Sequence, residues 1–230
     1  MCNLLESLPP PKPASNTTST DSTNFVIVPH TGNGRVADKT AFPFQLSKEG
    51  AFETYKEIRL EVPLGVELFD VGRKELGELA AKVVQYESPI HVEEVARRVR
   101  EAFVLGRTGR RILESISDAL EQVGRQGKVA REGEFWSAAN SGLKNPRCRR
   151  GAAASLRRPD RIAPVEYRLA IVAVLQAAVA ASSSELTVGV ARIMGFDRTG
   201  PDLDQVISDQ IELMIQNGQV QATDGKIHLS

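Results

Sequence analysis

Residues 106–129, GRTGRRILESISDALEQVGRQGKV, decide the predicted fold, because a second stretch repeats their pattern. Residues 197–220 read DRTGPDLDQVISDQIELMIQNGQV. Both stretches have Arg-Thr-Gly, then apolar residues at helical spacing, then Gly-X-Val. Thr108 and Thr199 mark the same point of the pattern, 91 residues apart. The sequence therefore predicts the same helical element twice.

The residues around the first stretch predict three helices closed by a hairpin. A break is expected before Pro89, because the residue before a proline avoids the helical region. Gly127 is expected to end the third helix, and residues 128–137 alternate like two short strands around a tight turn. This order is typical of a winged helix-turn-helix. The expected helices cover residues 74–86, 91–104 and 110–126.

The second stretch lies in a similar setting. Pro164 suits the first turn of a helix, the serines from Ser182 suit a helix start, and Asp224-Gly225 predicts a hairpin turn. We expect the second middle helix to be about one turn shorter than the first, because residues 95–97 and 190–192 both read Val-Ala-Arg at an offset of 95. The expected helices cover residues 164–180, 182–197 and 201–217.

The predicted fold class is mainly α with small β-hairpins, arranged as tandem winged helix-turn-helix units. The start of the chain is rich in Pro, Ser, Thr and Asn, which indicates a disordered tail. The expected parts are a tail (1–24), a short mixed segment (25–73), a first basic winged-helix unit (74–137), a basic linker (138–163) and a second acidic unit (164–230).

The net charge of zero conceals a strong asymmetry along the chain. Residues 86–161 contain 16 Lys and Arg against 10 Asp and Glu, whereas residues 162–230 contain 4 against 8. A basic middle part indicates an anionic partner, with a solvated basic face as the alternative. No apolar run is long enough to predict a membrane span. Cys2 and Cys148 form no disulfide framework, which favours a cytoplasmic protein.

Catalytic chemistry finds little support in the sequence. His30, His91 and His228 have no partner at metal-ligand spacing, and neither cysteine lies in a Cys-X-X-Cys motif. His91 opens a helix and is interpreted as a turn or capping residue. Residues 30–35, HTGNGR, lack the lysine and the following helix of a phosphate-binding loop. We therefore expect no enzyme, no cofactor and no metal.

Nucleic-acid binding is the function that the residue pattern favours. In a helix-turn-helix the third helix meets DNA with its N-terminal residues, and free backbone N–H groups there suit a phosphate. The linker adds arginines that are expected to form a flexible strip along phosphates. The candidate DNA-binding residues are Arg100, Arg107, Thr108, Arg110, Arg111, Lys128, Arg131, Arg149, Arg150, Arg157 and Arg158, with Lys144, Arg147 and Arg161 also in the linker.

Two observations weigh against a continuous DNA-binding surface. Several arginines have a glutamate four residues away and are open to interpretation as ordinary surface pairs; these are Glu93–Arg97, Glu94–Arg98, Arg97–Glu101 and Arg110–Glu114. In the second unit Asp197, Asp202, Asp204 and Asp209 crowd the end that would meet DNA, where carboxylates would repel phosphates. A protein-docking role without nucleic-acid binding is the alternative, with the second unit as the docking surface.

Residues 87–112, ESPIHVEEVARRVREAFVLGRTGRRI, resemble a domain of unknown function, DUF3320, found at the C-terminus of large bacterial superfamily one helicase proteins that carry a restriction-endonuclease-like domain. The resemblance continues through GKVAREGEF (127–135), LRRPDRIAPVEYRLAI (156–171) and IMGFDRTG (193–200), and spans residues 54–229. After the first hairpin, WSAANSG (136–142) replaces the Trp-Pro pair that is usual in the family.

This resemblance implies an accessory role, since the family's helicase and nuclease motifs are absent from the sequence. The family module has no established activity to transfer. We expect a non-catalytic module in which the first unit and the linker contact DNA phosphates. A helicase or nuclease protein is the expected second partner, through the acidic unit, and no membrane is expected.

Overall fold

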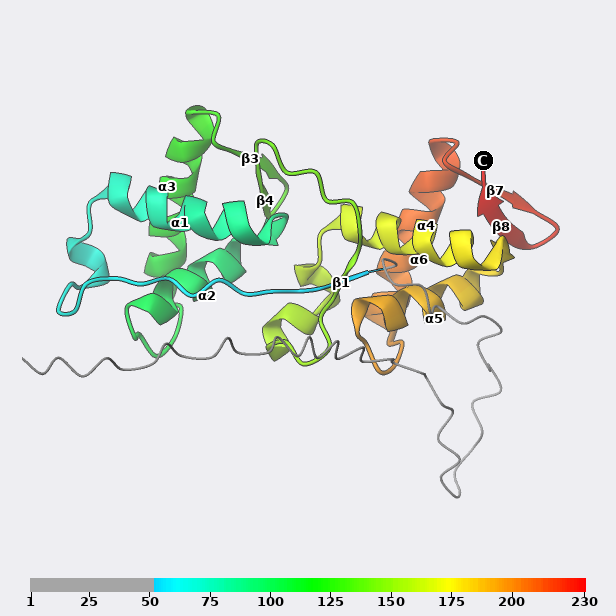
Figure 1. Ribbon diagram of the computed structural model, residues 1–230, viewed down its shortest axis with the longest axis horizontal. Coiled ribbons are helices and arrows are strands. Elements are labelled where there is room, and N and C mark those ends of the chain that lie inside the picture. The colour runs from blue at the N-terminus through cyan, green and yellow to red at the C-terminus, as the bar shows by residue number, and fades with distance from the viewer. Residues whose placement is uncertain (1–51) are drawn as a thin grey trace, which may run out of the picture. The chain divides into compact units, whose positions relative to one another are not determined.

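The three helices predicted for the first repeat are present, each within a few residues of its predicted bounds (Figure 1). The computed structural model describes residues 52–230. The tail predicted for residues 1–24, and the mixed segment as far as residue 51, lie outside this part. A short helical turn, η1 (Leu68–Asp70), precedes the repeat. The helices are α1 (Arg73–Glu87), α2 (Val92–Ala102) and α3 (Arg110–Arg125).

The second repeat follows the first at a constant offset. Each of its three helices begins 91 residues after its counterpart. The prediction of a shorter middle helix is wrong, because α5 has 12 residues and α2 has 11. The Val-Ala-Arg match at an offset of 95 is coincidental, and Val99 is the counterpart of Val190. The helices are α4 (Pro164–Ala178), α5 (Ser183–Met194) and α6 (Pro201–Gln216).

Both predicted hairpins are present, and each is extended by a strand that the sequence did not predict. The first sheet has the order β2-β4-β3 and the second the order β6-β8-β7, with every pair antiparallel. β2 and β6 have two residues each, too few for an alternating pattern to show. The strands are β2 (Ile90–His91), β3 (Val129–Glu132), β4 (Phe135–Ala138), β6 (Ala180–Ala181), β7 (Val220–Thr223) and β8 (Lys226–Leu229).

Local capping explains where the helices begin and end. His91 Nδ1 accepts the Glu93 N–H at 3.1 Å, so the predicted capping role of His91 is confirmed. Ser182 forms a full capping box with Glu185 at the start of α5. Gly127, just beyond α3, has a φ of +73°, a backbone conformation in which glycine avoids the steric cost of a side chain.

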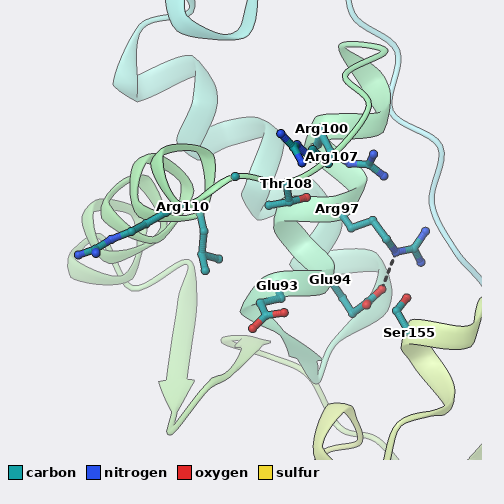
Figure 2. A pocket seen from close by; sticks show the side chains of 10 residues that line it. Glu93, Glu94, Arg97, Arg100, Arg107, Thr108, Arg110 and Ser155 are labelled. Carbon is teal, nitrogen blue, oxygen red and sulfur yellow. Dashed lines mark hydrogen bonds and ion pairs between the residues drawn. The ribbon is translucent and has the colours of Figure 1, made fainter.

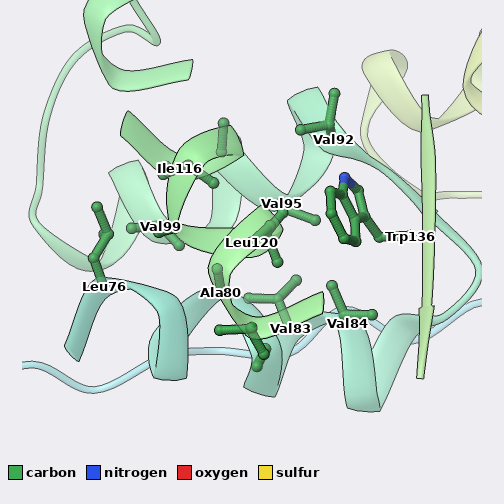
Figure 3. Close-up of a cluster of buried hydrophobic side chains, with 14 of the residues drawn as sticks. Leu76, Ala80, Val83, Val84, Val92, Val95, Val99, Ile116, Leu120 and Trp136 are labelled. Carbon is green, nitrogen blue, oxygen red and sulfur yellow. The ribbon is translucent and has the colours of Figure 1, made fainter. Parts of the chain in front are cut away.

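Each repeat has its own apolar core. In the first repeat α1, α2 and α3 pack around Val95, Ile116 and Leu120, and Trp136 of β4 closes one side (Figure 3). The second repeat buries Leu186, Ile207 and Ile211, the counterparts of these three helix residues. The repeats therefore share one packing scheme. The described residues are mainly α-helical with small β-sheets, and no helix among them is both long and apolar enough to cross a membrane.

The segment between the repeats is built into the structure, which corrects the expectation of a flexible strip. It contains η2 (Ala154–Arg157), η3 (Pro159–Arg161) and β5 (Arg147–Cys148). β5 pairs in parallel with β1 (Glu53–Thr54), a pairing that the sequence did not predict.

Arg147 and Arg149 are buried at this junction by a shared carboxylate. Glu166 of α4 is fully buried and accepts hydrogen bonds from both guanidinium groups, the shortest at 2.6 Å from Arg149. Arg147 also donates to the Glu87 carbonyl at the end of α1, at 2.7 Å. Tyr55 stacks on both arginines and donates to the Glu87 carboxylate at 2.7 Å. Arg147 thus links the two repeats, because it pairs with Glu166 of α4 and donates to the backbone carbonyl at the end of α1.

Candidate nucleic-acid interface

The turn between α2 and α3 forms one wall of an open pocket of about 500 Å³ (Figure 2). Four arginines lie around it from two helices and the turn, together with Thr108 and the start of α3. Gly109 is the N-cap of α3 and offers no side chain to its first-turn N–H groups. The pocket therefore combines cationic side chains with the positive end of a helix dipole. Its lining residues are Glu93, Glu94, Arg97, Arg100, Arg107, Thr108, Gly109, Arg110, Leu113 and Ser155.

Arg100 holds the turn in place. Its Nη1 donates to the carbonyl oxygens of Leu105 at 2.9 Å and Gly106 at 2.7 Å. Its Nη2 contacts Glu101 at 3.0 Å, and its Nε is buried without a hydrogen-bond partner in the described part of the chain. Arg100, which the sequence placed among the DNA-binding residues, is therefore mainly a positioning residue for the turn.

Arg97 is neutralised within the protein. It contacts Glu57 and Glu94 at 2.8 Å each and Glu101 at 2.9 Å. Burial opposes the charge of Glu57, but the hydrogen bond from Arg97 and the charge of Arg98 lower the pKa of Glu57 below its ordinary value. Glu57 is thus ionised at neutral pH, and Arg97 has little charge left for an anion. The Arg97–Glu101 pair was predicted, whereas the contact with Glu57 was not.

The start of α3 carries the most accessible positive charge of the pocket. Arg107 is exposed and forms no ion pair within residues 52–230, and Thr108 beside it is also exposed. Arg110 is exposed and contacts Glu114 at 2.7 Å, as predicted from their spacing. Arg111 lies 4.1 Å above the ring of Phe69, outside the pocket lining. The structure therefore brings Arg107, Thr108 and Arg110 together and sets Arg111 to one side.

The β3–β4 hairpin contributes less than the sequence predicted. Arg131 is bracketed by Glu121 at 2.8 Å and Glu134 at 3.3 Å, and its Nε donates to the Gly133 carbonyl. Lys128 is exposed just before β3. An exposed ion pair keeps part of its charge available to a strong anion, because such pairs contribute only about 1 kcal/mol or less.

The linker cations differ in exposure: Arg147 and Arg149 are buried, Arg161 is partly buried, and the exposed ones are Lys144, Arg150, Arg157 and Arg158. Arg149 is 2% exposed and bound to Glu166, so its charge does not reach the surface. Arg150 lies 3.9 Å from Asp197, and Arg158 forms a two-point contact with Asp160. Arg157 lines a smaller pocket of about 260 Å³ beside Gly195 and Phe196. These side chains do not join Arg107 around the larger pocket.

The corresponding positions of the second repeat have lost almost all of this charge. Only Arg107 has a cationic counterpart, Arg198, and it is flanked by Asp197 and Asp202. The constant offset of 91 residues between the helix starts makes the comparison direct. Arg100, Arg110, Arg111, Lys128 and Arg131 correspond to Ala191, Pro201, Asp202, Gln219 and Ala222.

Two features near the pocket were not predicted from the sequence. Ser155 reaches the pocket from η2, and no local pattern in the linker indicated this contact. Arg161 contacts Glu93 at 2.7 Å and lies against the ring of His91. Burial and the charge of Arg161 lower the pKa of His91 below its ordinary value of 6.5. Residues 52–230 contain no group of three or more His, Cys, Asp and Glu side chains placed to hold a metal ion.

Comparison with known proteins supports the resemblance seen in the sequence. No curated protein matches the chain. One family model matches a segment of the chain that begins before η1 and ends within α3. This segment contains every pocket residue except Ser155. Residues 66–114 match the family model described as "Protein of unknown function (DUF3320)", which confirms the predicted relationship over these residues.

Proposed function

We propose that the chain is a non-catalytic DNA-binding module whose first repeat contacts DNA phosphates at the α2–α3 turn. Each repeat has the order helix, strand, helix, helix, strand, strand, which supports the interpretation as a winged helix-turn-helix. In that arrangement α2 and α3 form the helix-turn-helix and β3–β4 forms the wing.

One observation carries the proposal: apart from Arg107, the cationic side chains of the first repeat have uncharged or acidic counterparts in a second repeat with the same order of elements. Core packing does not explain why the two repeats differ in charge at these positions. Both repeats bury equivalent apolar residues, and the cationic side chains are not part of either core. Arg107, Thr108 and Arg110 gather at the end of α3, where phosphate oxygens gain both charge and backbone N–H donors. Lys128 is exposed at the other end of α3, just before β3, and so offers a separate positive charge beside the wing.

The second repeat is assigned a different partner. Asp202 and Asp204 are exposed in the first turn of α6, where they would repel a phosphate. We propose that this surface docks a protein, in keeping with the family's occurrence at the end of helicase–nuclease proteins. The alternative function for the whole chain is protein docking without DNA.

Fluorescence anisotropy with a labelled forked duplex, titrated at several salt concentrations, tests the proposal. The triple change of Arg107, Arg110 and Arg111 to alanine removes the charge at the start of α3. Arg107→Ala and Arg198→Ala form a matched pair, because both arginines are exposed and occupy the same position of the two repeats.

We expect salt-sensitive binding by the wild type, with the log–log slope reduced by about 0.9 for each phosphate contact removed. Arg107→Ala is expected to weaken binding, and Arg198→Ala to leave it unchanged or to alter it much less. Absence of binding at low salt by a folded chain refutes the DNA proposal and leaves protein docking. Equal losses in the two variants refute the assignment to the first repeat.

A further inference from the structure

The α2–α3 turn exposes two apolar residues at the side of the cationic pocket. Val104 is 90% exposed and Leu105 is 36% exposed, and both lie between pocket residues Arg100 and Arg107 in the sequence. Val104 has a φ of +55°, a conformation that a β-branched residue rarely adopts. The turn is nevertheless well held, because Arg100 binds the Leu105 and Gly106 carbonyls and the Val104 N–H donates to Glu101 O at 3.0 Å.

Acidic side chains on the exposed face of α3 disfavour the binding of a DNA duplex along this helix. Glu114, Asp118 and Glu121 are spaced four and three residues apart and so form one stripe. Each carboxylate contacts an arginine, one from α3 itself, one from α1 and one from β3; the pairs are Arg110–Glu114 at 2.7 Å, Arg73–Asp118 at 3.3 Å and Arg131–Glu121 at 2.8 Å. The stripe is about 10 Å long at 1.5 Å per residue. A groove laid over α3 would place these acids against closely spaced phosphates.

Contact is therefore favoured at the tip of the turn rather than along the helix. The tip pairs an exposed apolar surface, Val104 and Leu105, with a pocket large enough for a phosphate group. Four arginines line this pocket, and its two glutamates, Glu93 and Glu94, are paired with Arg161 and Arg97. Inside a duplex both faces of every base pair are covered by stacking. At a DNA end the last base pair has one bare apolar face, and a terminal phosphate lies beside it.

We infer that the α2–α3 turn recognises DNA ends, with Val104 and Leu105 against the terminal base pair and the terminal phosphate in the pocket. This inference rests on the proposed function and specifies its substrate class. Apolar side chains are known to pack against unstacked base steps, and arginines to bind phosphates. Arg107 and Arg110 are the phosphate-binding residues, and Arg100 positions the turn.

The decisive experiment compares an open duplex carrying 5′-phosphates with a duplex of the same sequence whose two ends are closed by flexible synthetic linkers. Competition anisotropy with the full chain gives the affinity for each. We expect the open duplex to bind about tenfold more tightly, the size expected for burial of one valine side chain. Removal of the 5′-phosphates is expected to reduce this preference.

Two glycine substitutions provide a matched pair. Val104→Gly removes the apolar tip and suits the positive φ, so the variant is expected to fold. Val179 is also an exposed valine with a positive φ, +66°, but it lies at the end of α4 in the second repeat. Val104→Gly is expected to remove most of the preference for open ends, leaving the part that the terminal phosphates contribute, and Val179→Gly to retain it in full.

The possible results distinguish the recognition of DNA ends from DNA binding as such. Equal affinity for open and closed duplexes overturns the inference and leaves the proposed function standing. A preference for open ends that is undiminished in Val104→Gly overturns the role of the turn. Absence of binding to either duplex refutes the proposed function itself.

Discussion

Replacing Glu166 by glutamine is expected to destabilise the protein strongly, because one buried carboxylate compensates two buried guanidinium groups. Glu166 is fully buried, and the side chains of Arg147 and Arg149 are 9% and 2% exposed. The carboxylate oxygens accept four hydrogen bonds between 2.6 and 3.0 Å. Glutamine keeps the shape but offers one acceptor oxygen, and it turns an N–H group toward a cation.

Breaking a buried ion pair by removing one partner costs about 3–5 kcal/mol. This is a large part of the roughly 5–15 kcal/mol by which native proteins are stable. At about 2–4 °C per kcal/mol for a chain of this size, the melting temperature is expected to fall by roughly 6–20 °C. The loss should depend on pH. Burial opposes the charge of Glu166, but Arg149 and Arg147 hold its pKa below the ordinary value of 4.5.

A depressed carboxyl pKa contributes stability that is present above pH 4.5 and is lost as the pH falls through the folded-state pKa. Glu166→Gln should therefore flatten the acid limb of the stability profile. Urea unfolding followed by circular dichroism and by tryptophan fluorescence measures both effects. Trp136, the single tryptophan, is buried in the first repeat, whereas Glu166 lies in the second. Coincident transitions in the wild type would indicate that the junction couples the repeats.

Asp160→Asn is the matched control, since it makes the same change from acid to amide in an exposed carboxylate that pairs with Arg158 at 2.8 Å and, more distantly, with Arg161 at 3.4 Å. Exposed pairs contribute about 1 kcal/mol or less, so only a small loss is expected. If Glu166→Gln lowers the free energy of unfolding by less than about 1 kcal/mol and leaves the acid limb unchanged, the reasoning is refuted. Two buried guanidinium groups without a compensating carboxylate are expected to destabilise the protein by more than that.

Two further predictions concern backbone and capping residues. Because burial and Arg161 depress the pKa of His91, the unfolded chain binds more protons, and stability should rise as the pH increases from the folded-state pKa through 6.5. His91→Asn keeps a capping acceptor and should remove this dependence in urea titrations between pH 5 and 7; an unchanged slope would contradict the assignment. Gly195→Ala should lower the free energy of unfolding by more than about 1 kcal/mol, because φ is +89° and the new Cβ would approach the Arg150 nitrogen to 2.5 Å. Gly218→Ala, with a φ of +67° and open space around it, should cost less, and equal losses would show that the close approach is irrelevant.

The helices were predictable because their stability depends on local patterns. Ile116 and Leu120 lie at helical spacing, and Gly127 marks a stop, so the sequence indicates α3 without reference to the rest of the chain. The two-residue strands β2 and β6 gave no such signal. The length of the second middle helix was also predicted wrongly, because a chance Val-Ala-Arg match suggested a shorter helix than α5 proves to be.

The candidate site was predictable only in part. The exposure of Arg107 and the Arg110–Glu114 pair follow from positions on one helix and its turn. The binding of Arg100 to the turn depends on how the chain bends after α2, which spacing does not reveal. Arg149 was grouped with exposed linker arginines because charged residues are usually exposed.

The sequence by itself determined the two repeats, their apolar stripes and their opposite charge, since these are properties of residue order and of helical periodicity. Only the tertiary structure decided which charges reach the surface. Glu166 of α4 pairs with Arg147 and Arg149, and Arg147 also donates to the backbone carbonyl of Glu87 at the end of α1; these contacts join residues far apart in sequence and form through folding alone. Pairing across such distances depends on three-dimensional packing, and it removes linker charge that composition had assigned to DNA.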